Sequence, residues 1–153
     1  MIRAGDAAES ALERRREKIL LVDDAPENLR ILSECLRDKY TIMFAKNGPD
    51  ALRLAIGTPQ PDLILLDVIM PGMDGYEVCR RLKEDPSTRD IPVMFITAQN
   101  EETDEATGLS LGAQDYIVKP FRVSLVRNRV ANQLTYKRYR DHLNDLVHER
   151  TRQ

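Results

Sequence analysis

The stretch LILLDVIMPGMDG, residues 63–75, decides the expected fold, because a charged residue follows directly on a run of aliphatic ones. Four consecutive apolar residues leave no polar face, so residues 63–66 are predicted to form a strand covered on both sides, as in a parallel sheet. The proline and glycines that follow predict a loop. Asp67 therefore stands at the carboxyl end of this strand, the edge at which open α/β sheets bind ligands.

Length and composition predict one soluble domain in the cytoplasm. A chain of 153 residues, 42% hydrophobic and 31% charged, can bury a core without disulfides or metals. Cys35 and Cys79 lie far apart without a CxxC partner, which favours two buried thiols over a disulfide or a zinc site. No apolar leader core precedes Ile19 and no segment is long enough to span a bilayer, so no membrane association is expected.

Charge is distributed unevenly along the chain. Residues 19–121 carry 10 Lys and Arg against 18 Asp and Glu, whereas residues 122–153 carry 8 against 3. An acidic body suits cation binding and argues against a nucleic-acid partner. In the basic tail the charges alternate with apolar residues, which is typical of a solvated helix face.

Five short aliphatic runs alternate with amphipathic stretches. The predicted strands are residues 18–22, 40–45, 63–66, 93–97 and 115–118. The predicted helices between them are residues 27–38, 49–56, 76–84 and 101–111. This alternation is typical of a parallel sheet with helices on both faces, and right-handed crossovers leave few topologies. The leading prediction is a doubly wound, flavodoxin-like α/β domain with five parallel strands in the order 2-1-3-4-5.

Both ends of the chain are expected to differ from a central domain of residues 18–133. Residues 1–17, rich in Ala, Glu and Arg, predict a short helix or a frayed arm, and the arm is favoured because no apolar pattern repeats there strongly enough to dock. A single long helix is predicted from Val123 onward, with Val123, Val126 and Val130 spaced to pack on the sheet.

A second apolar stripe follows on residues 134–153. Its members share the 3-4-3 spacing of a coiled-coil seam: Tyr136, Tyr139, Leu143 and Leu146. The two stripes are out of register, so the second is predicted to leave the domain and pair with another helix, expected to be that of a second copy in a homodimer. A helix lying wholly on its own domain is the weaker alternative, because so small a domain offers little surface for so many turns.

Three carboxylates are expected to converge at one edge of the sheet. Asp23 and Asp24 follow the first predicted strand, Asp67 follows the third, and the strand order makes these strands neighbours. Like charges so close raise one another's proton affinity unless a cation compensates, so the cluster predicts a bound divalent metal. Oxygen ligands without a nearby His or Cys favour Mg²⁺ over zinc.

Two further strand ends carry groups that complement a carboxylate. Thr97 offers a hydroxyl and Lys119 an ammonium. With a metal, they would surround the outer oxygens of a phosphoryl group, and Asp67 would be the nucleophile that forms an acyl phosphate. The ordinary alternatives are a helix cap for Asp23 or Asp24, a strand residue for Thr97 and a solvated charge for Lys119. Complementary chemistry at four strand ends on one edge favours the site.

The chain resembles the receiver domain of bacterial two-component response regulators. The matching motifs are VDD at 22–24, LLDVIMPGMDG at 65–75, ITA at 96–98 and DYIVKPF at 115–121. The resemblance covers the chain from about Lys18 to the last helix. It implies the five-stranded fold, and phosphorylation of Asp67 by a sensor histidine kinase or a phosphotransfer protein.

For the metal, the resemblance implies a specific set of ligands. Asp24 and Asp67 would bind Mg²⁺ directly and Asp23 would help through water. The main-chain carbonyl of Ile69 would complete the set. No other cofactor is implied.

For the phosphoryl group, the resemblance implies that Thr97 and Lys119 hold its oxygens. Tyr116 would be an aromatic switch that rotates when Thr97 is drawn toward the phosphate. Ala98 is small enough to leave access for the incoming group, and the Lys119-Pro120 bond would be cis, as X-Pro bonds readily are.

The output of the receiver is expected to lie outside these motifs. The ending VHERTRQ, residues 147–153, resembles the linker of regulators that continue into a cyclic-dinucleotide synthase or hydrolase domain. The chain is therefore predicted to be a relay without substrate turnover of its own, acting on an output domain through its last helix. The alternative is a single-domain regulator that acts on a separate partner.

Two other functional classes fit the sequence less well. A haloacid-dehalogenase-like phosphatase also uses an aspartyl nucleophile and Mg²⁺, but it requires a second aspartate where this chain has Ile69. A flavin binder requires a hydroxyl-rich phosphate loop after the first strand. The chain has DDAPEN there, residues 23–28, whose acids repel a phosphate.

Overall fold

The computed structural model describes residues 16–98, 112–113 and 115–151. The predicted helix over residues 101–111 and nearly all of the predicted arm over residues 1–17 lie outside the described residues. None of the helices in the described part of the chain combines the length and the apolar character that a bilayer crossing requires.

Five parallel strands form the centre of the molecule. They are β1 (Lys18–Val22), β2 (Thr41–Ala45), β3 (Leu63–Asp67), β4 (Val93–Ala98) and β5 (Asp115–Lys119). Their order is β2-β1-β3-β4-β5, and every neighbouring pair is parallel. The predicted doubly wound topology is confirmed, and the predicted strand bounds differ from the observed ones by at most one residue.

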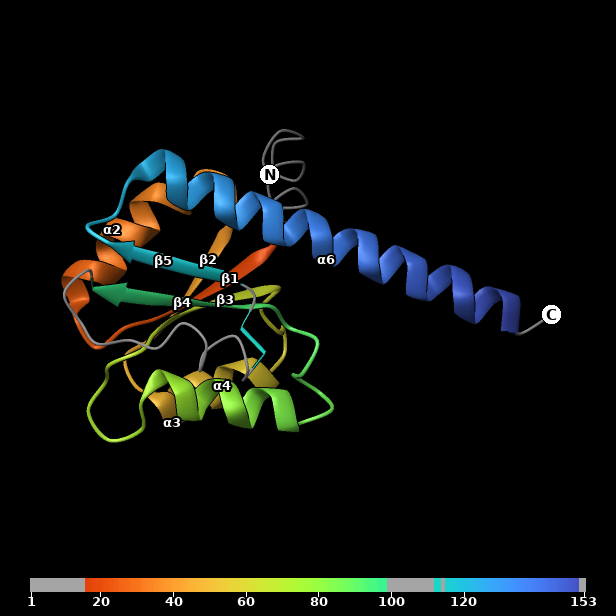
Figure 1. Cartoon of the computed structure of the whole chain (residues 1–153), viewed down its shortest axis with the longest axis horizontal. Helices are drawn as coiled ribbons and strands as arrows, with labels where there is room; N and C mark the ends of the chain where they lie inside the picture. The colour runs from red at the N-terminus through yellow and green to blue at the C-terminus, as the bar shows by residue number, and fades with distance from the viewer. Residues whose placement is uncertain (1–15, 99–111, 114, 152–153) are drawn as a thin grey trace, which may run out of the picture.

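Helices cover both faces of the sheet. The helices among the described residues are α2 (Pro26–Leu36), α3 (Gly48–Ile56), α4 (Gly75–Glu84) and α6 (Val123–Thr151). In Figure 1, α2 and α6 lie on one face of the sheet, and α3 and α4 lie on the other. The strands between these layers are buried on both faces, which explains the uninterrupted aliphatic run of β3.

Alternate residues along each strand divide the core into two clusters. On one face Leu20, Ile64 and Phe95 pack beneath α3 and α4. On the other face Leu21 and Leu65 pack beneath α2 and α6. Cys35 and Cys79 are not joined in a disulfide, lie one in each cluster, and are both buried as predicted. The packing on both faces fixes the strand register, because a slip of one residue would exchange the two sets.

The first half of α6 is part of the core. Val126, Val130 and Leu134 are fully buried against the sheet and α2. The prediction that Val123 packs on the sheet is wrong, because its side chain is 51% exposed. The first turn of α6 lies over a hollow beside the end of α2, which Val123 lines together with Asp38.

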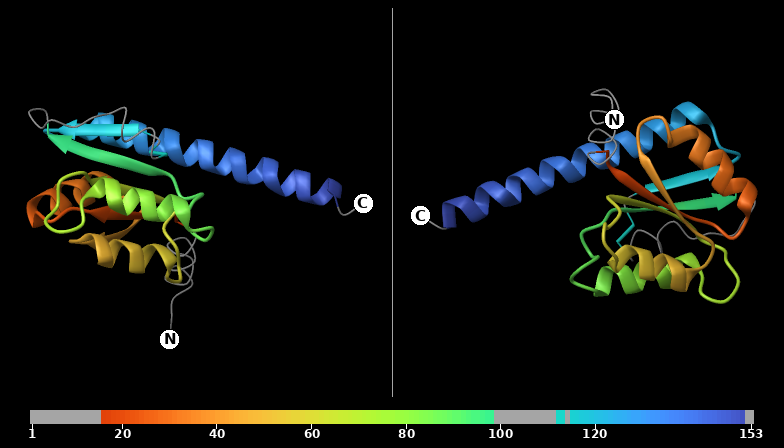
Figure 2. Two further views of the ribbon diagram at one scale, coloured as in Figure 1. Left: turned by 60° about the horizontal axis from the view of Figure 1, so that its bottom comes forward. Right: turned by 180° about the vertical axis from the view of Figure 1, so that it is seen from behind.

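The second half of α6 projects beyond the body. The helix runs back across the sheet and leaves past the amino ends of the strands, and its last turns stand clear of the domain (Figures 1 and 2). Polar contacts to the body continue past residue 133. They join Lys137 to Asp62, Arg138 to Glu17, and Arg140 to the main-chain carbonyl of Asp90.

Candidate functional site

Three carboxylates meet at the carboxyl edge of the sheet. Asp23 and Asp24 directly follow β1, and Asp67 is the last residue of the neighbouring β3. Carboxylate oxygens of the three residues lie within 4.8 Å of one another. Asp23 and Asp67 are buried, whereas Asp24 is exposed. The convergence predicted from the sequence is therefore present, with one carboxylate open to solvent and two enclosed.

Within the described part of the chain, one ammonium group faces the two buried carboxylates. The Lys119 Nζ lies 3.7 Å from Asp23 Oδ2 and 3.9 Å from Asp67 Oδ2. A single positive charge at these distances does not neutralise three carboxylates. The cluster thus retains an excess of negative charge in a partly desolvated place.

Asp23 does not cap the helix that follows it. The residue at the start of α2 is Ala25, and no side chain caps this helix. Asp23 Oδ1 instead accepts a hydrogen bond from the Ala25 N–H at 2.9 Å. Its Oδ2 is buried without a hydrogen-bond donor, which is costly for a charged oxygen unless something else binds it.

The donor set fits a hard divalent cation. All three side chains, Asp23, Asp24 and Asp67, offer oxygen ligands only. Asp23 Oδ2 is buried without a hydrogen-bond partner, and the exposed Asp24 leaves room for water. Magnesium prefers such ligands and keeps part of its water shell. No His or Cys belongs to this group within the described residues, so the ligands that zinc prefers are missing.

Asp67 holds its proton unusually strongly in the absence of a cation. Burial is the largest cause that raises its pKa, to about 7, and the charge of Asp23 adds to it. Lys119 and the hydrogen bond from the Ile69 N–H to Asp67 Oδ1, 3.3 Å long, act in the opposite direction. A bound cation would release this proton by favouring the charged form.

The loop after Asp67 is held by a close backbone approach at Gly75. The Gly75 N–H donates to the Val68 carbonyl at 2.8 Å. A Cβ at this position would lie 2.2 Å from the main-chain oxygen of Asp67, so any other residue would push α4 away from the end of β3. Asp74 caps α4 by accepting from the Glu77 N–H at 2.9 Å. From the sequence, Gly75 was predicted only as part of a loop.

Thr97 and Lys119 come from neighbouring strands beside Asp67. Asp67 pairs with Ile96 of β4, one residue before Thr97, and Ala98 of β4 pairs with Lys119 of β5. Thr97 is only 4% exposed. The strand register therefore brings the hydroxyl-bearing and ammonium-bearing residues to the edge that holds the carboxylates, as the sequence predicted.

The two remaining predicted residues lie on either side of this cluster. Tyr116 on β5 is buried, with its ring 5.5 Å from that of Phe95, centroid to centroid. Ile69 is exposed in the loop after Asp67, and its N–H contacts the carboxylate. The Lys119-Pro120 bond is cis, as the resemblance implied.

The model of the response regulator receiver domain matches residues 19–131, which include the acidic cluster and all of the sheet except the first residue of β1. The chain belongs to the response regulator receiver family. Receiver domains of this family share the five-stranded fold seen here.

Relatives of this receiver domain include longer regulators. This chain is 45% identical over 127 residues to the response regulator PleD of Caulobacter vibrioides, with 82% of this chain aligned. It is 43% identical over 123 residues to a probable cyclic di-GMP phosphodiesterase of Vibrio cholerae, with 80% aligned. In both cases the match covers 28% of the relative's length.

A solved structure supports the same assignment. The receiver domain of a signal transduction histidine kinase from Syntrophus aciditrophicus is 37% identical and superposes with a TM-score of 0.70. The match covers 78% of this chain and 90% of that one. The family and the fold are therefore shown by sequence and by structure.

Proposed function

We propose that Asp67 is the phosphoacceptor of a two-component signalling system. An oxygen of the Asp67 carboxylate attacks the phosphorus of a phosphohistidine on a kinase or phosphotransfer protein. The phosphorus–nitrogen bond breaks, its electron pair stays on the imidazole, and an acyl phosphate forms. The observation that carries this proposal is the position of Asp67, buried between two carboxylates and one ammonium at the strand ends.

Each neighbouring group has a role in this transfer. Asp24, Asp67, Asp23 and the Ile69 carbonyl would hold Mg²⁺, which supplies positive charge for the phosphoryl oxygens when bound. Lys119 would move from the carboxylates to a phosphoryl oxygen, and the Thr97 hydroxyl would donate to another. The carboxylate of Asp67 must be charged to attack, so its raised pKa makes transfer dependent on the cation.

A conformational response would follow from the added charge. A phosphoryl group carries about −1.5 to −2 charges at neutral pH, enough to draw Thr97 and Lys119 inward. In this structure Tyr116 is already buried beside Phe95. The proposed switch therefore stabilises this buried position of Tyr116 over an exposed one when Thr97 is drawn to the phosphate.

Incubation with acetyl phosphate and Mg²⁺ tests the phosphoacceptor. Wild type is expected to gain one phosphoryl group per chain by intact mass, and Asp67→Asn none. Asp62→Asn is the matched control, because Asp62 is a carboxylate at the opposite edge of the sheet that pairs with Lys137. Equal labelling of wild type and Asp67→Asn would contradict the assignment.

We propose further that α6 carries the signal to an output domain in a longer protein. The two relatives named above are about three and a half times as long as the matched region, and one is named a probable cyclic di-GMP phosphodiesterase. In this proposal the chain turns over no substrate, binds no nucleic acid and works in the cytoplasm, where a kinase can reach it. The boundary between the receiver and the helical extension lies near residue 133.

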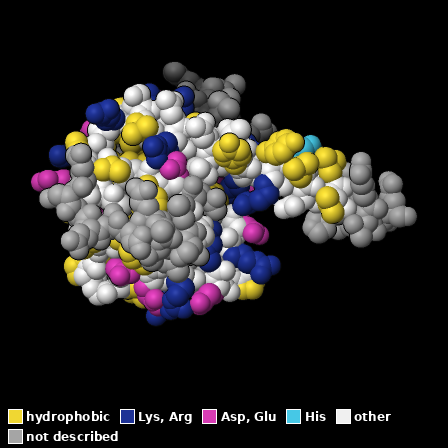
Figure 3. All heavy atoms as spheres, viewed as in Figure 1, with side chains coloured by type: hydrophobic (Ala, Val, Ile, Leu, Met, Phe, Trp, Pro, Cys, Tyr) yellow, Lys and Arg dark blue, Asp and Glu magenta, His cyan; other side chains and the backbone are white. Residues whose placement is uncertain are grey.

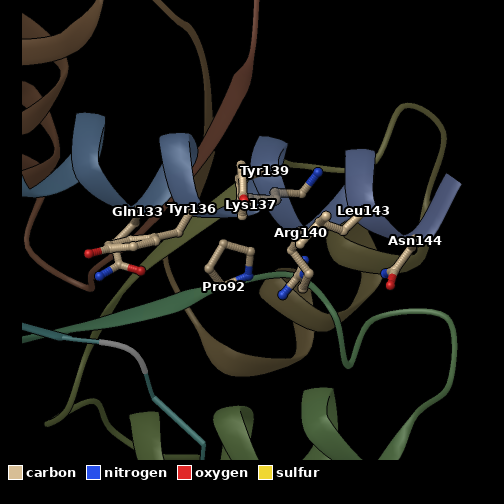
Figure 4. A pocket seen from close by; sticks show the side chains of 8 residues that line it. All are labelled: Pro92, Gln133, Tyr136, Lys137, Tyr139, Arg140, Leu143 and Asn144. Atoms are coloured by element: carbon tan, nitrogen blue, oxygen red, sulfur yellow. The ribbon is translucent and has the colours of Figure 1, made fainter. Parts of the chain in front are cut away.

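A homodimer through the projecting half of α6 is the proposed form of this output. Hydrophobic side chains gather along that half in Figure 3, and Tyr136 and Tyr139 are 70% and 64% exposed. With Leu143 they line a groove of about 570 Å³ against Pro92, shown in Figure 4. Pairing with a second copy would bury this stripe as a short coiled coil.

Sedimentation tests the homodimer. Wild type is expected to form a concentration-dependent dimer, because so short a seam is weak by itself. Leu143→Asp should be monomeric, whereas His142→Asp, which adds a carboxylate beside the stripe, should still associate. A wild-type chain that remains monomeric at high micromolar concentration would favour the alternative, a single-domain regulator of a separate partner.

A further inference from the structure

Three aromatic rings form a continuous row through one face of the core. Tyr76 of α4 meets Phe95 of β4 edge to face, with ring centroids 5.2 Å apart and an interplanar angle of 74°. Phe95 in turn lies 5.5 Å from Tyr116 of β5. Phe95 is fully buried, Tyr116 nearly so, and Tyr76 packs against the same cluster. Such pairs contribute more than the area that they bury, and their geometry depends on the position of both rings.

The first ring of this row is tied to the backbone of Asp67. Tyr76 directly follows Gly75, whose N–H bonds to the Val68 carbonyl and whose Cα stands against the Asp67 carbonyl. At Gly75 there is no room for a Cβ between the start of α4 and the end of β3. A shift of the backbone at Asp67 or Val68 must therefore move Tyr76, because close-packed groups transmit displacement.

The carboxylate itself is tied to the same loop. The Ile69 N–H donates to Asp67 Oδ1 at 3.3 Å. A phosphoryl group on Asp67 changes the charge and the direction of the oxygens that accept this bond. The loop from residue 68 to residue 75 thus receives the modification at one end and holds Tyr76 at the other.

We propose that Tyr76 and Phe95 form a second connection between Asp67 and Tyr116, beside the one through Thr97. Tyr76 is the positioning residue of this connection: its ring holds Phe95, and Phe95 holds Tyr116 in its buried position. The proposal rests on the proposed function, because phosphorylation of Asp67 is the input. Two connections to one ring explain how Tyr116 senses both β4, through Thr97, and the loop after β3.

A purely structural role for Tyr76 makes a different prediction. If the ring only fills space, its loss lowers stability and leaves the response of Tyr116 to phosphorylation unchanged. If it positions Phe95, its loss reduces the response even where the protein is fully folded. The state of the Tyr116 ring separates these possibilities, and overall stability does not.

Fluorine NMR of the full chain labelled with 3-fluorotyrosine measures that state. The chain contains five tyrosines, and the Tyr116 signal is the one that Tyr116→Phe removes. Spectra are compared before and after beryllofluoride and Mg²⁺, with saturation checked by titration. Tyr76→Leu is expected to reduce the displacement of the Tyr116 signal by about half and to weaken beryllofluoride binding by about fivefold, since coupling is reciprocal.

Matched variants give this test its controls. Tyr76→Phe keeps the ring and should behave as wild type. Tyr40→Leu removes another partly buried tyrosine, from the cluster on the opposite face, and should leave the Tyr116 displacement unchanged. Phe95→Leu interrupts the row in its middle and should reproduce the effect of Tyr76→Leu, which keeps the test open if one variant fails to fold. Thr97→Ala should retain part of the displacement, and the double variant with Tyr76→Leu should lose it.

Specific outcomes would overturn the proposal. If the Tyr116 signal of Tyr76→Leu and of Phe95→Leu moved as far as that of wild type on beryllofluoride binding, the row of rings would be core packing only. A Tyr76→Phe variant as defective as Tyr76→Leu would assign the effect to the hydroxyl and not to the ring. Failure of wild type to bind beryllofluoride at all would instead overturn the proposed function, and acetyl phosphate labelling of Asp67 distinguishes that case.

Discussion

The two edges of the sheet formed by the carboxyl ends and by the amino ends of its strands use charged side chains in opposite ways. At the carboxyl edge, Asp23, Asp24 and Asp67 share one ammonium, and two of the three carboxylates are buried. At the amino edge, basic residues of α6 are matched with acceptors that precede β1, β3 and β4. These contacts are Arg138 with Glu17, Lys137 with Asp62, and Arg140 with the Asp90 carbonyl.

The difference shows that one sheet can place a reactive acidic cluster at one edge and the ion pairs that hold a helix at the other. Paired charges in contact with water contribute little free energy, and they direct α6 along its path out of the body. Buried carboxylates in excess of the positive charges around them are unfavourable until a cation binds. Under the proposed function, the amino edge holds the output helix and the carboxyl edge receives the phosphoryl group.

The largest expected effect at the carboxyl edge comes from the backbone. Gly75→Ala should lower the free energy of unfolding by at least about 3 kcal/mol, because its Cβ would stand 2.2 Å from the Asp67 carbonyl oxygen. Urea unfolding measures this. Gly57→Ala is the control, since a Cβ there meets its nearest atom at 3.4 Å. Similar values for both variants would show that α4 can move away from β3 without cost.

The second prediction concerns pH and the proton on Asp67. Its pKa is raised to about 7 in the folded chain, so the folded state binds more protons than the unfolded state between about pH 4 and pH 7. The resulting stability is present below about pH 4 and is lost as pH rises through 7.

Metal-free Asp67→Asn should escape this loss. At pH 8 in chelator it should exceed wild type by about 2–3 kcal/mol in the free energy of unfolding, and the difference should narrow toward pH 4. Added Mg²⁺ should stabilise wild type and not the variant, because the ion binds the folded site. A pH-independent difference between the two proteins would contradict the assigned cause.

The third prediction removes the only ammonium that faces the carboxylates among the described residues. Lys119→Met should raise the pKa of Asp67 further, because Lys119 is one of the groups that lower it. At pH 8 in chelator the variant should lose about 1–2 kcal/mol of stability relative to wild type, since Asp23 and Asp67 then lack a counter-charge. The same urea series measures it. If the free energy of unfolding of the variant depended on pH as that of wild type does, the ion pairs of Lys119 with Asp23 and Asp67, at 3.7 and 3.9 Å, would not contribute to stability.

The smallest effect is expected at the amino edge. Arg138→Ala should lower the free energy of unfolding by less than about 1 kcal/mol, because Arg138 and Glu17 form an ion pair in contact with solvent. Leu134→Ala, four residues earlier on the same helix, should cost about 2–5 kcal/mol because that side chain is fully buried. If Arg138→Ala lowered the free energy of unfolding as much as Leu134→Ala does, the contrast between the two edges would be wrong.

The sequence by itself determined the strand order, the acidic cluster and the candidate roles of Asp67, Thr97 and Lys119. It could do so because continuous aliphatic runs, turn residues and charged strand ends are local signals, and parallel strands with right-handed crossovers allow few arrangements. The exposed stripe on the second half of α6 was predictable for the same reason, since helical periodicity is local.

Only the tertiary structure decided which surfaces those local elements meet. The periodicity of α6 could not show that Val123 overhangs a hollow and stays exposed, or that the helix leaves at the edge opposite Asp67. The requirement for Gly75 and the row from Tyr76 through Phe95 to Tyr116 likewise depend on residues distant in sequence. Close approaches between separate elements are set by how whole layers pack, and no pattern within one element records them.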